Sequence, residues 1–176
     1  MVDITVFTPL YNRASLLIDA YESLLRQNYH SFEWVIVDDG STDNAEQIVN
    51  TFIGDAIHTF PISYIRKENG GKHTAINRGV KEAKGELFLI LDSDDTLPAD
   101  SLVTIAQYYE QCKGYKGCAG VCGLMAHHDG QLIGTGFPKE PMYESALQFR
   151  YAEKGNVTGD LLEVYKTSVM REFPFP

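Results

Sequence analysis

Short apolar runs alternate with amphipathic segments along this chain up to about residue 110, and this alternation restricts the fold more than any other feature. The apolar runs have the length of buried β-strands, whereas the segments between them carry apolar residues at helical spacing. The expected strands are 4–8, 33–39, 62–68 and 86–92, and the expected helices are 14–27, 43–52, 73–84 and 98–109. Such alternation is typical of a largely parallel sheet with helices on both faces. The sequence therefore predicts an α/β fold with a Rossmann-like sheet.

Polar and acidic residues stand where three of the expected strands end. They are Thr8 and Pro9, then Asp38 and Asp39, and then Asp92, Asp94 and Asp95. In open parallel sheets, ligands bind beyond the carboxyl ends of the strands. This predicts a ligand site at that edge of the sheet. The first strand–helix junction, TPLYNR, lacks the glycine fingerprint of a dinucleotide site.

The acidic end of the fourth strand, LFLILDSDDTL at 87–97, fits two chemistries. Carboxylates this close resist ionising together unless a cation neutralises them. As a D-x-D-x-T strand, the stretch would serve an aspartate-nucleophile phosphatase, with Asp92 as nucleophile and Asp94 as general acid. As a D-x-D motif, it would bind a metal and a nucleotide diphosphate. A phosphatase needs further strand–helix units after this strand, and the alternation ends soon after Thr96, which favours the second interpretation.

The acidic end of the second strand allows a binding-module alternative. VDDGSTD partly matches the D-x-S-x-S metal loop of adhesion-type domains, but Asp43 stands where the second serine is needed. A nucleotide- or metal-binding module without transfer activity therefore remains an alternative to an enzyme.

The alternation fails from Lys113 onward. Two apolar runs, 118–126 and 131–135, flank an HHDG turn and predict an antiparallel hairpin. A short helix at 144–152, a loop at 155–160, a strand at 161–165 and a helix at 166–173 are expected next. We therefore predict one domain with two halves, 1–112 and 113–176. The abrupt FPFP end suggests that the second half continues beyond this chain.

Composition limits the partners of the chain. Its formal net charge of −9 argues against nucleic-acid binding. This acidic chain nevertheless contains a cluster of basic residues, here called the basic island. It consists of Arg66, Lys67, Lys72, His73, Arg78, Lys81 and Lys84. This island fits either a solvated helix face or a site for an anionic ligand. Three cysteines without metal-type spacing predict reduced thiols, and no signal peptide or apolar span of about 20 residues is evident. We predict a cytoplasmic protein without a transmembrane segment, and leave open its association with a membrane surface.

Four separated motifs carry a family resemblance. TVFTPLYNRASLL, EWVIVDDGSTD, NGGKHTAINRG and GELFLILDSDD occur in the order and spacing typical of family 2 glycosyltransferases, and GDLLEVYKTSVM resembles a later segment of that family. The resemblance is strongest over residues 3–110. It implies a GT-A fold, in which residues 1–112 bind a nucleotide-sugar and residues 113–176 begin the acceptor side.

The resemblance also implies roles for single residues. Pro9, Tyr11 and Asn12 would form one wall of the nucleoside pocket. Asp39 would accept a hydrogen bond from the base, which suits the N3–H of uracil because an ionised carboxylate only accepts. Asn69, Gly70, Gly71 and Lys72 would face the nucleotide, and Asp92 the ribose. Asp38 and Ser41 fit turn and cap chemistry at least as well as ligand binding.

The expected cofactor is Mn²⁺ or Mg²⁺, held by Asp94 with Asp95 as a second candidate. A divalent cation would neutralise the diphosphate leaving group of a donor, expected to be a UDP-sugar. The acceptor would be a glycan or a lipid-linked hydroxyl. An inverting transfer needs a general base, which the resemblance places beyond Pro176. Within the chain, Asp129, Asp160 and Glu163 are the weak candidates for that base.

Overall fold

The computed structural model describes residues 2–55, 57–137, 145 and 157–176. By its internal contacts the chain divides into two units, one formed by Met1–Val121 with Val164–Pro176 and the other by Cys122–Glu163. The first unit contains the predicted strand–helix alternation. The functional division at residue 112 stays a prediction.

Six strands form one sheet in the order β3-β2-β1-β4-β6-β5. The strands are β1 (Ile4–Leu10), β2 (Phe32–Asp38), β3 (Ile62–Arg66), β4 (Leu87–Ile90), β5 (Gly120–Leu124) and β6 (Leu161–Lys166). β1 pairs in parallel with β2 and β4, and β2 pairs in parallel with β3. β6 runs antiparallel to β4. The predicted architecture, mostly parallel with an antiparallel second half, is therefore confirmed.

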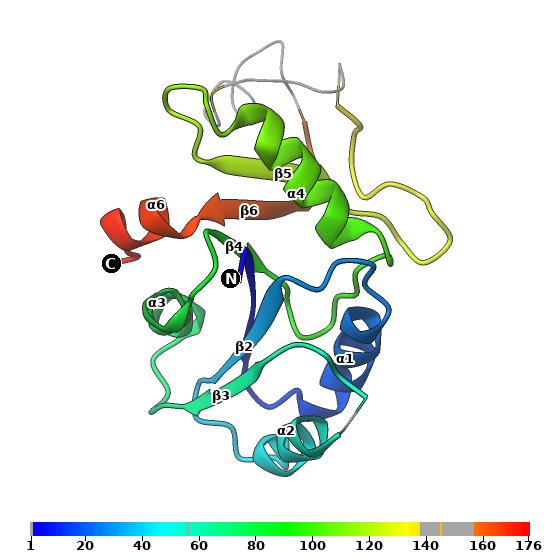
Figure 1. Cartoon of the computed structure of the whole chain (residues 1–176). Coiled ribbons are helices and arrows are strands. Elements are labelled where there is room, and N and C mark those ends of the chain that lie inside the picture. Colours follow the sequence, from blue (N-terminus) through cyan, green and yellow to red (C-terminus); the bar gives the residue numbers. More distant parts are fainter. Residues whose placement is uncertain (1, 56, 138–144, 146–156) are drawn as a thin grey trace. The chain divides into compact units, whose positions relative to one another are not determined.

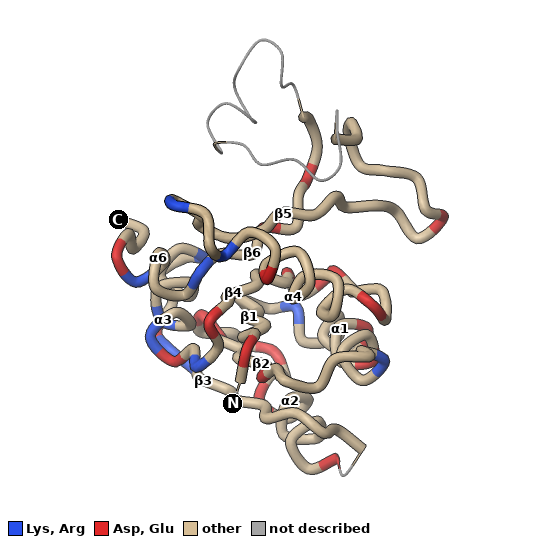
Figure 2. The backbone as a smooth tube through the Cα atoms, turned by 45° about the horizontal axis from the view of Figure 1, so that its top comes forward, with Lys and Arg blue, Asp and Glu red and all other residues tan. Residues whose placement is uncertain are grey.

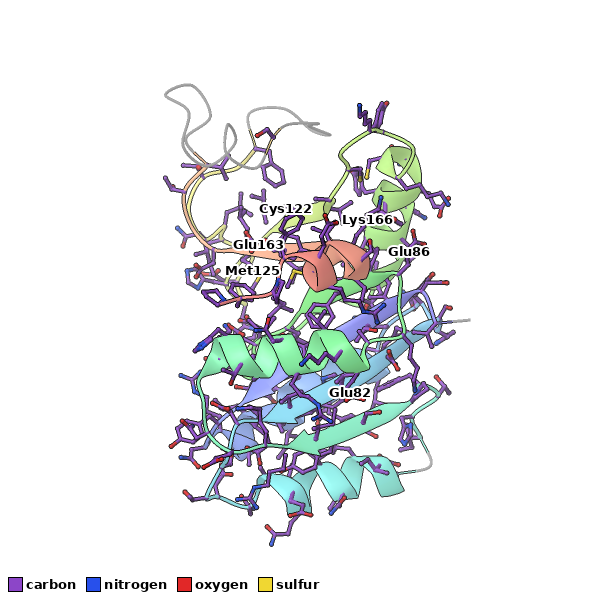
Figure 3. The ribbon with its side chains drawn as sticks, turned by 90° about the vertical axis from the view of Figure 1, so that its left-hand side faces the viewer. Glu82, Glu86, Cys122, Met125, Glu163 and Lys166 are labelled. Carbon is purple, nitrogen blue, oxygen red and sulfur yellow. The ribbon has the colours of Figure 1, made fainter. Side chains whose placement is uncertain are left out.

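Helices cover both faces of the parallel strands (Figure 1). A 3-10 turn η1 (Ala14–Leu16), α1 (Leu17–Leu25) and α2 (Ala45–Gly54) lie on one face, and α3 (Lys72–Glu82) lies on the other. α6 (Thr167–Glu172) packs beside α3 on that second face (Figure 3), and α4 (Ser101–Cys112) follows β4. No helix within the described part of the chain is both long and apolar enough to cross a membrane.

Aromatic rings fill the core on both faces of the sheet. Tyr21 of α1 and Phe52 of α2 stack with centroids 4.3 Å apart, and both rings stack on Trp34 of β2. On the α3 face, the buried rings of Phe7 and Phe88 stack 5.0 Å apart. Both faces of the central strands β1, β2 and β4 are buried, as is typical of nearly continuous apolar runs.

β1 continues through Pro9 to Leu10, although the sequence predicted an end before the proline. Pro9 has no backbone N–H, so it cannot donate a hydrogen bond to a neighbouring strand, and a strand with neighbours on both sides tolerates proline poorly. Here β4 pairs only as far as Phe7, whereas β2 pairs with Pro9 and Leu10. The proline therefore lies where β1 has become an edge, and its chain runs on into the predicted ligand site.

Several predicted boundaries are wrong by a few residues. The helix predicted at 43–52 begins at Ala45, and Asp43 accepts hydrogen bonds from the N–H groups of Ala45 at 3.2 Å and Ala14 at 3.0 Å. The helix predicted at 98–109 starts at Ser101, because the Leu97 and Pro98 carbonyls accept hydrogen bonds from the buried Gln27. At both helix starts, a contact distant in sequence accompanies the shifted boundary.

The predicted hairpin forms only in part. The HHDG turn is present, with His127 N–H donating to Gln131 at 2.8 Å, but the second arm makes a single bridge, Ala126 to Leu132, and is not a strand. The backbone of the second arm pairs elsewhere, since Thr135 N–H donates to the Thr158 carbonyl at 3.1 Å. The helix predicted at 144–152 lies outside the described residues, apart from residue 145. Cys112, Cys118 and Cys122 form no disulfide.

Gly79 allows α3 to lie close to the sheet, which leads to a stability prediction. A Cβ at this position would lie 2.3 Å from the ring of the fully buried Phe7. Gly79→Ala gains up to about 1 kcal/mol of helix propensity, but overpacking costs about 1–3 kcal/mol. We therefore expect a net destabilisation, measured as a lower urea midpoint. Gly114→Ala is the control, because its Cβ would meet nothing within 4 Å; an unchanged midpoint in Gly79→Ala would contradict the close approach.

Candidate functional site

A pocket of about 570 Å³ opens beyond the carboxyl ends of β1, β2 and β4, where the sequence predicted a ligand. Its volume is typical of small-molecule sites. Seven of the residues predicted to bind a nucleotide line it: Pro9, Tyr11, Asp39, Asn69, Gly71, Lys72 and Asp92. Leu10, Arg13, Ala75 and Ser93 complete the lining. The pocket thus brings together residues from three separate strand ends.

Asp39 connects the end of β2 to the loop before α3. Its Oδ1 accepts from Lys67 Nζ at 2.5 Å and from Gly70 N–H at 3.0 Å, and its Oδ2 accepts from Gly71 N–H at 2.7 Å. Asn69 Nδ2 donates to the Asp39 carbonyl at 2.9 Å. Gly71 has a φ of 93°, a conformation that glycine adopts without strain. The Asp39 carboxylate therefore holds the glycine loop in place at the pocket wall.

The Asp39 carboxylate stays ionised and keeps room for one more donor. Its burial raises the pKa, but the hydrogen bonds from Lys67, Gly70 and Gly71 outweigh burial, so the pKa lies below its ordinary value of 3.8. Each carboxylate oxygen accepts about two hydrogen bonds. Among the described residues, Oδ1 has two hydrogen-bond donors and Oδ2 has one. A ligand N–H in the pocket could therefore donate to Oδ2.

Asp38 is a structural residue. Its Oδ1 accepts from Ser41 N–H at 2.7 Å, and its Oδ2 accepts from Tyr64 Oη at 2.5 Å. The side chain is almost completely buried. Burial and the Asp38 carboxylate together raise the pKa of Tyr64 well above its ordinary range. Of the two neighbouring acids, Asp39 lines the pocket and Asp38 holds the turn.

Asn12 lies outside the pocket lining and holds the neighbouring loops together. Its Oδ1 accepts from Thr42 N–H at 2.8 Å. Asn12 N–H donates to Ser41 Oγ at 2.9 Å, and its φ of 52° turns the chain between Tyr11 and Arg13. Asn12 and Ser41 therefore link the two loops that follow β1 and β2. Tyr11, whose side chain is 51% exposed, is left free to face the pocket.

Lys72 pairs with Asp92 across the pocket. Lys72 Nζ lies 2.7 Å from both carboxylate oxygens of Asp92, but only the contact to Oδ2 has hydrogen-bond geometry. Oδ1 is shielded from solvent and lacks a hydrogen-bond partner among the described residues. Lys72 therefore neutralises the Asp92 carboxylate through both oxygens and forms a hydrogen bond to one of them.

Arg13 pairs with Asp94, and the sequence interpretation had missed it. Arg13 Nη1 lies 2.9 Å from Asp94 Oδ2, and both side chains are about half exposed. Arg13 lines the pocket, whereas Asp94 and Asp95 do not. The available signal was its place in TPLYNR, directly after a strand end. Lys67 was also missed as a partner of Asp39, although it follows β3 at the same sheet edge.

The acidic residues fit a divalent cation only in part. Carboxylate oxygens are the ligands that Mg²⁺ and Mn²⁺ prefer, and the unpartnered Oδ1 of Asp92 and the half-exposed Asp94 provide them. No group of three or more His, Cys, Asp or Glu side chains in the described part of the chain could hold a metal. A cation here would therefore need further oxygens from a bound molecule. Mg²⁺ is often held in this way, by one or two protein carboxylates together with the phosphates of a substrate.

The basic island is mostly used in ion pairs with acids. Figure 2 shows lysines and arginines (blue) on α3. Lys67 and Lys72 pair with the pocket acids Asp39 and Asp92, whereas Arg78 forms an exposed pair with Glu82 at 2.9 Å. Lys72 thus lines the pocket, whereas Arg78 lies on a solvated helix surface, and the site for an anionic ligand stays a prediction.

The weak candidates for a general base belong to the unit Cys122–Glu163. Asp160 is exposed and Glu163 is half-buried. Asp129 accepts from Gln131 N–H at 3.0 Å within the HHDG turn. That bond gives Asp129 a local structural role.

Comparisons with known proteins identify the family of this chain. The family model described as "Glycosyl transferase family 2" matches residues 5–170. The glycosyltransferase GlyG of Streptococcus pneumoniae serotype 4 is 36% identical over 109 residues, which are 61% of this chain and 35% of that protein. The glycosyltransferase GlyA of the same organism is 36% identical over 171 residues, 97% of this chain and 23% of that protein. This chain thus spans about a third or less of the length of these relatives.

Two solved structures share the fold. S. aureus TarS 1–349 in complex with UDP superposes with a TM-score of 0.70 at 22% identity, covering 99% of this chain and 50% of that one. The mannosyltransferase PcManGT from Pyrobaculum calidifontis, in complex with GDP-Man and Mn²⁺, gives a TM-score of 0.70 at 23% identity, covering 98% and 47%. This likeness confirms the predicted GT-A fold. Because the family model matches nearly the whole chain, the protein belongs to glycosyl transferase family 2.

Proposed function

We propose that this protein transfers a sugar from a nucleotide-diphosphate donor to an acceptor hydroxyl, with uridine as the expected base. One observation carries the proposal: a single pocket at the sheet edge gathers seven residues that the motifs assign to a nucleotide. Family membership supports transfer over the phosphatase alternative, in which Asp92 would be a nucleophile. The pairing of Asp92 with Lys72 also suits a binding role.

In this proposal, the nucleoside lies against Pro9 and Tyr11. The exposed Tyr11 ring offers an apolar face to a base, and the unused lone pair of Asp39 Oδ2 suits the N3–H of uracil. The acceptor oxygen of Asp39 discriminates against bases that present an acceptor at this edge, because two acceptors would then oppose each other. Asp92 lines the same pocket and would face the ribose.

The diphosphate lies between Lys72, Arg13 and a divalent cation, Mn²⁺ or Mg²⁺, held by Asp94 or Asp95. The cation supplies Lewis-acid neutralisation of the leaving diphosphate. Lys72 and Arg13 bind the phosphate oxygens, and Arg13 can do so with two parallel N–H groups. PcManGT, which binds GDP-Man and Mn²⁺ in its solved complex, lends support to a metal at this edge.

The remaining parts of the proposal concern the acceptor side. We propose an inverting transfer to a glycan or lipid-linked hydroxyl, in a cytoplasmic protein that works at or near a membrane surface. A general base would take the proton from the acceptor hydroxyl, and Asp160 and Glu163 are the weak candidates for it.

Isothermal titration calorimetry with UDP, with and without Mn²⁺, tests the proposal. We expect binding that Mn²⁺ strengthens, and weaker binding of ADP, whose base presents an acceptor nitrogen on that edge. The absence of UDP binding under both conditions would overturn the nucleotide site. Binding of UDP-sugars without transfer to glycan or lipid-linked acceptors would favour the binding-module alternative.

A further inference from the structure

Two thiols meet where α4 ends. Cys112 Sγ and Cys118 Sγ lie 3.2 Å apart, in hydrogen-bond contact. Cys112 is the last residue of α4, and Cys118 lies in the loop that leads to β5. Neither side chain lines the nucleotide pocket. The two sulfur atoms of a disulfide are about 2.05 Å apart, so these side chains need to approach each other by only about 1 Å to form one.

The backbone holds the two cysteines in this position. Tyr115 N–H donates to the Cys112 carbonyl at 2.9 Å, and Cys118 N–H donates to the Tyr115 carbonyl at 3.1 Å. These two turns bring the chain back onto the end of α4. Directly after them, Lys166 N–H of β6 donates to the Ala119 carbonyl at 2.7 Å. The pair is therefore fixed by α4 on one side and by the sheet on the other.

The two thiols differ in access and in acidity. The Cys112 side chain is only 7% exposed, and burial together with the hydrogen bond to Cys118 raises its pKa to about 11. Cys118 is half-buried. Access and thiolate character together decide which thiol reacts first. Cys118 is therefore the thiol that a dissolved reagent reaches first, with Cys112 held beside it.

We infer that Cys112 and Cys118 form a redox-active dithiol, which small-molecule disulfides such as oxidised glutathione convert to an intramolecular disulfide. The Cys118 thiolate attacks one sulfur of the oxidant and releases one glutathione thiolate, which leaves a mixed disulfide on Cys118. Cys112 then loses its proton and attacks Cys118 Sγ, which releases the second glutathione thiolate. The protein loses two protons and two electrons, and the oxidant is reduced to two thiols. Excess reduced glutathione reverses both steps.

The new bond would restrict the unfolded chain more than the folded one. It closes a loop from residue 112 to residue 118 and joins the end of α4 to the backbone that pairs with β6. A cross-link of this kind stabilises the fold mainly by reducing the freedom of the unfolded chain. Coupling between two equilibria is reciprocal, so the fold must favour the disulfide by the same factor. In reducing compartments, such disulfides are usually transient and sense the redox state.

Equilibration with mixtures of reduced and oxidised glutathione tests the inference. After an acid quench, thiol alkylation and peptide mass spectrometry should show that the native protein loses two of its three thiols, with Cys112 joined to Cys118. The effective concentration of one thiol at the other should be at least about tenfold higher in the native protein than in urea. The melting temperature of the oxidised protein should rise by about 5 °C.

Single substitutions assign the two steps. Cys122→Ser is the matched control, because it removes the third cysteine and should leave the disulfide and its effective concentration unchanged. When Cys112→Ser is added to Cys122→Ser, Cys118 should remain as the glutathione adduct, since the second step has lost its thiol. When Cys118→Ser is added instead, the buried Cys112 should react with oxidised glutathione at least about tenfold more slowly than Cys118 does.

Equal effective concentrations in native and urea-unfolded wild type would overturn the inference, because the fold would then not hold the two thiols together. A disulfide that joins Cys122 in place of Cys112 or Cys118 would overturn it as well. Both results come from the wild-type chain, so neither depends on the folding of a variant.

Discussion

Asp39→Ala is expected to lower the free energy of unfolding by about 3 kcal/mol, the cost of breaking a buried ion pair, and to abolish UDP binding. The Asp39 carboxylate holds Lys67, Gly70 and Gly71 together. Its loss leaves the partly buried Lys67 ammonium without its carboxylate and releases the loop that lines the pocket. For a chain of this size the melting temperature should fall by roughly 10 °C. Urea unfolding measures the first effect and calorimetry the second.

The double variant Asp39→Ala/Lys67→Met distinguishes scaffold from ligand contact. Removing the unpaired cation should restore part of the lost stability, because the destabilisation comes largely from a charge left without its partner. UDP binding should stay absent, since neither the loop anchor nor the acceptor for the base has returned. Recovery of binding in the double variant would mean that Asp39 acts only by neutralising Lys67.

Asp39 also makes stability depend on pH. Its folded-state pKa lies below the ordinary value of 3.8, so the folded protein binds fewer protons there than the unfolded chain. The stabilisation from this carboxylate is complete above about pH 4 and is lost as the pH falls through the lowered folded-state pKa. Asp39→Asn does not titrate. Its unfolding free energy should therefore fall less steeply than that of wild type below about pH 4, in urea titrations at matched ionic strength.

Asp94→Ala is expected to abolish the strengthening of UDP binding by Mn²⁺. A divalent cation that neutralises a diphosphate contributes several kcal/mol in a dry site, so the affinity measured with Mn²⁺ should fall by at least about tenfold. Binding without Mn²⁺ should change much less, because Arg13 loses its partner Asp94 and becomes available to phosphate. Calorimetry with and without Mn²⁺ measures both affinities.

Asp95→Ala ranks the two candidate ligands. Asp95 N–H donates to the Asp92 carbonyl at 3.0 Å, a backbone contact that the substitution retains. If Asp94 is the metal ligand, Asp95→Ala keeps a UDP affinity that responds to Mn²⁺. The reverse pattern would assign the metal ligand to Asp95 instead. In that pattern the UDP affinity of Asp94→Ala still responds to Mn²⁺ and that of Asp95→Ala does not.

The family motifs predicted most of the pocket lining, because the carboxyl ends of parallel strands meet at one edge of a sheet. Pro9, Asp39 and Asp92 each follow a different strand, and the parallel pairing of β1, β2 and β4 brings them together. Asn12 and Gly70 were the exceptions. The Asn12 side chain accepts from Thr42 N–H, in the loop that follows β2.

The second half was less predictable, because its pairing depends on distant segments. The apolar run after the HHDG turn has the composition of a strand, yet its backbone bonds to Thr158. β6 inserts beside β4 in the antiparallel sense, although more than 70 residues separate them along the chain. Periodicity describes how one segment repeats, and carries no information about which distant edge that segment will meet.

By itself, the sequence determined most of the secondary structure of the first unit, the parallel sheet and the edge at which the pocket lies. These properties follow from local periodicity and from the geometry of strand–helix connections. Only the tertiary structure decided which charges pair. It assigned Asp39 to the loop and Asp38 to the turn, and it brought Arg13 to Asp94 across 81 residues of chain. Ion pairs depend on distances of a few ångströms in space, and those distances are set only when the sheet and its helices have packed.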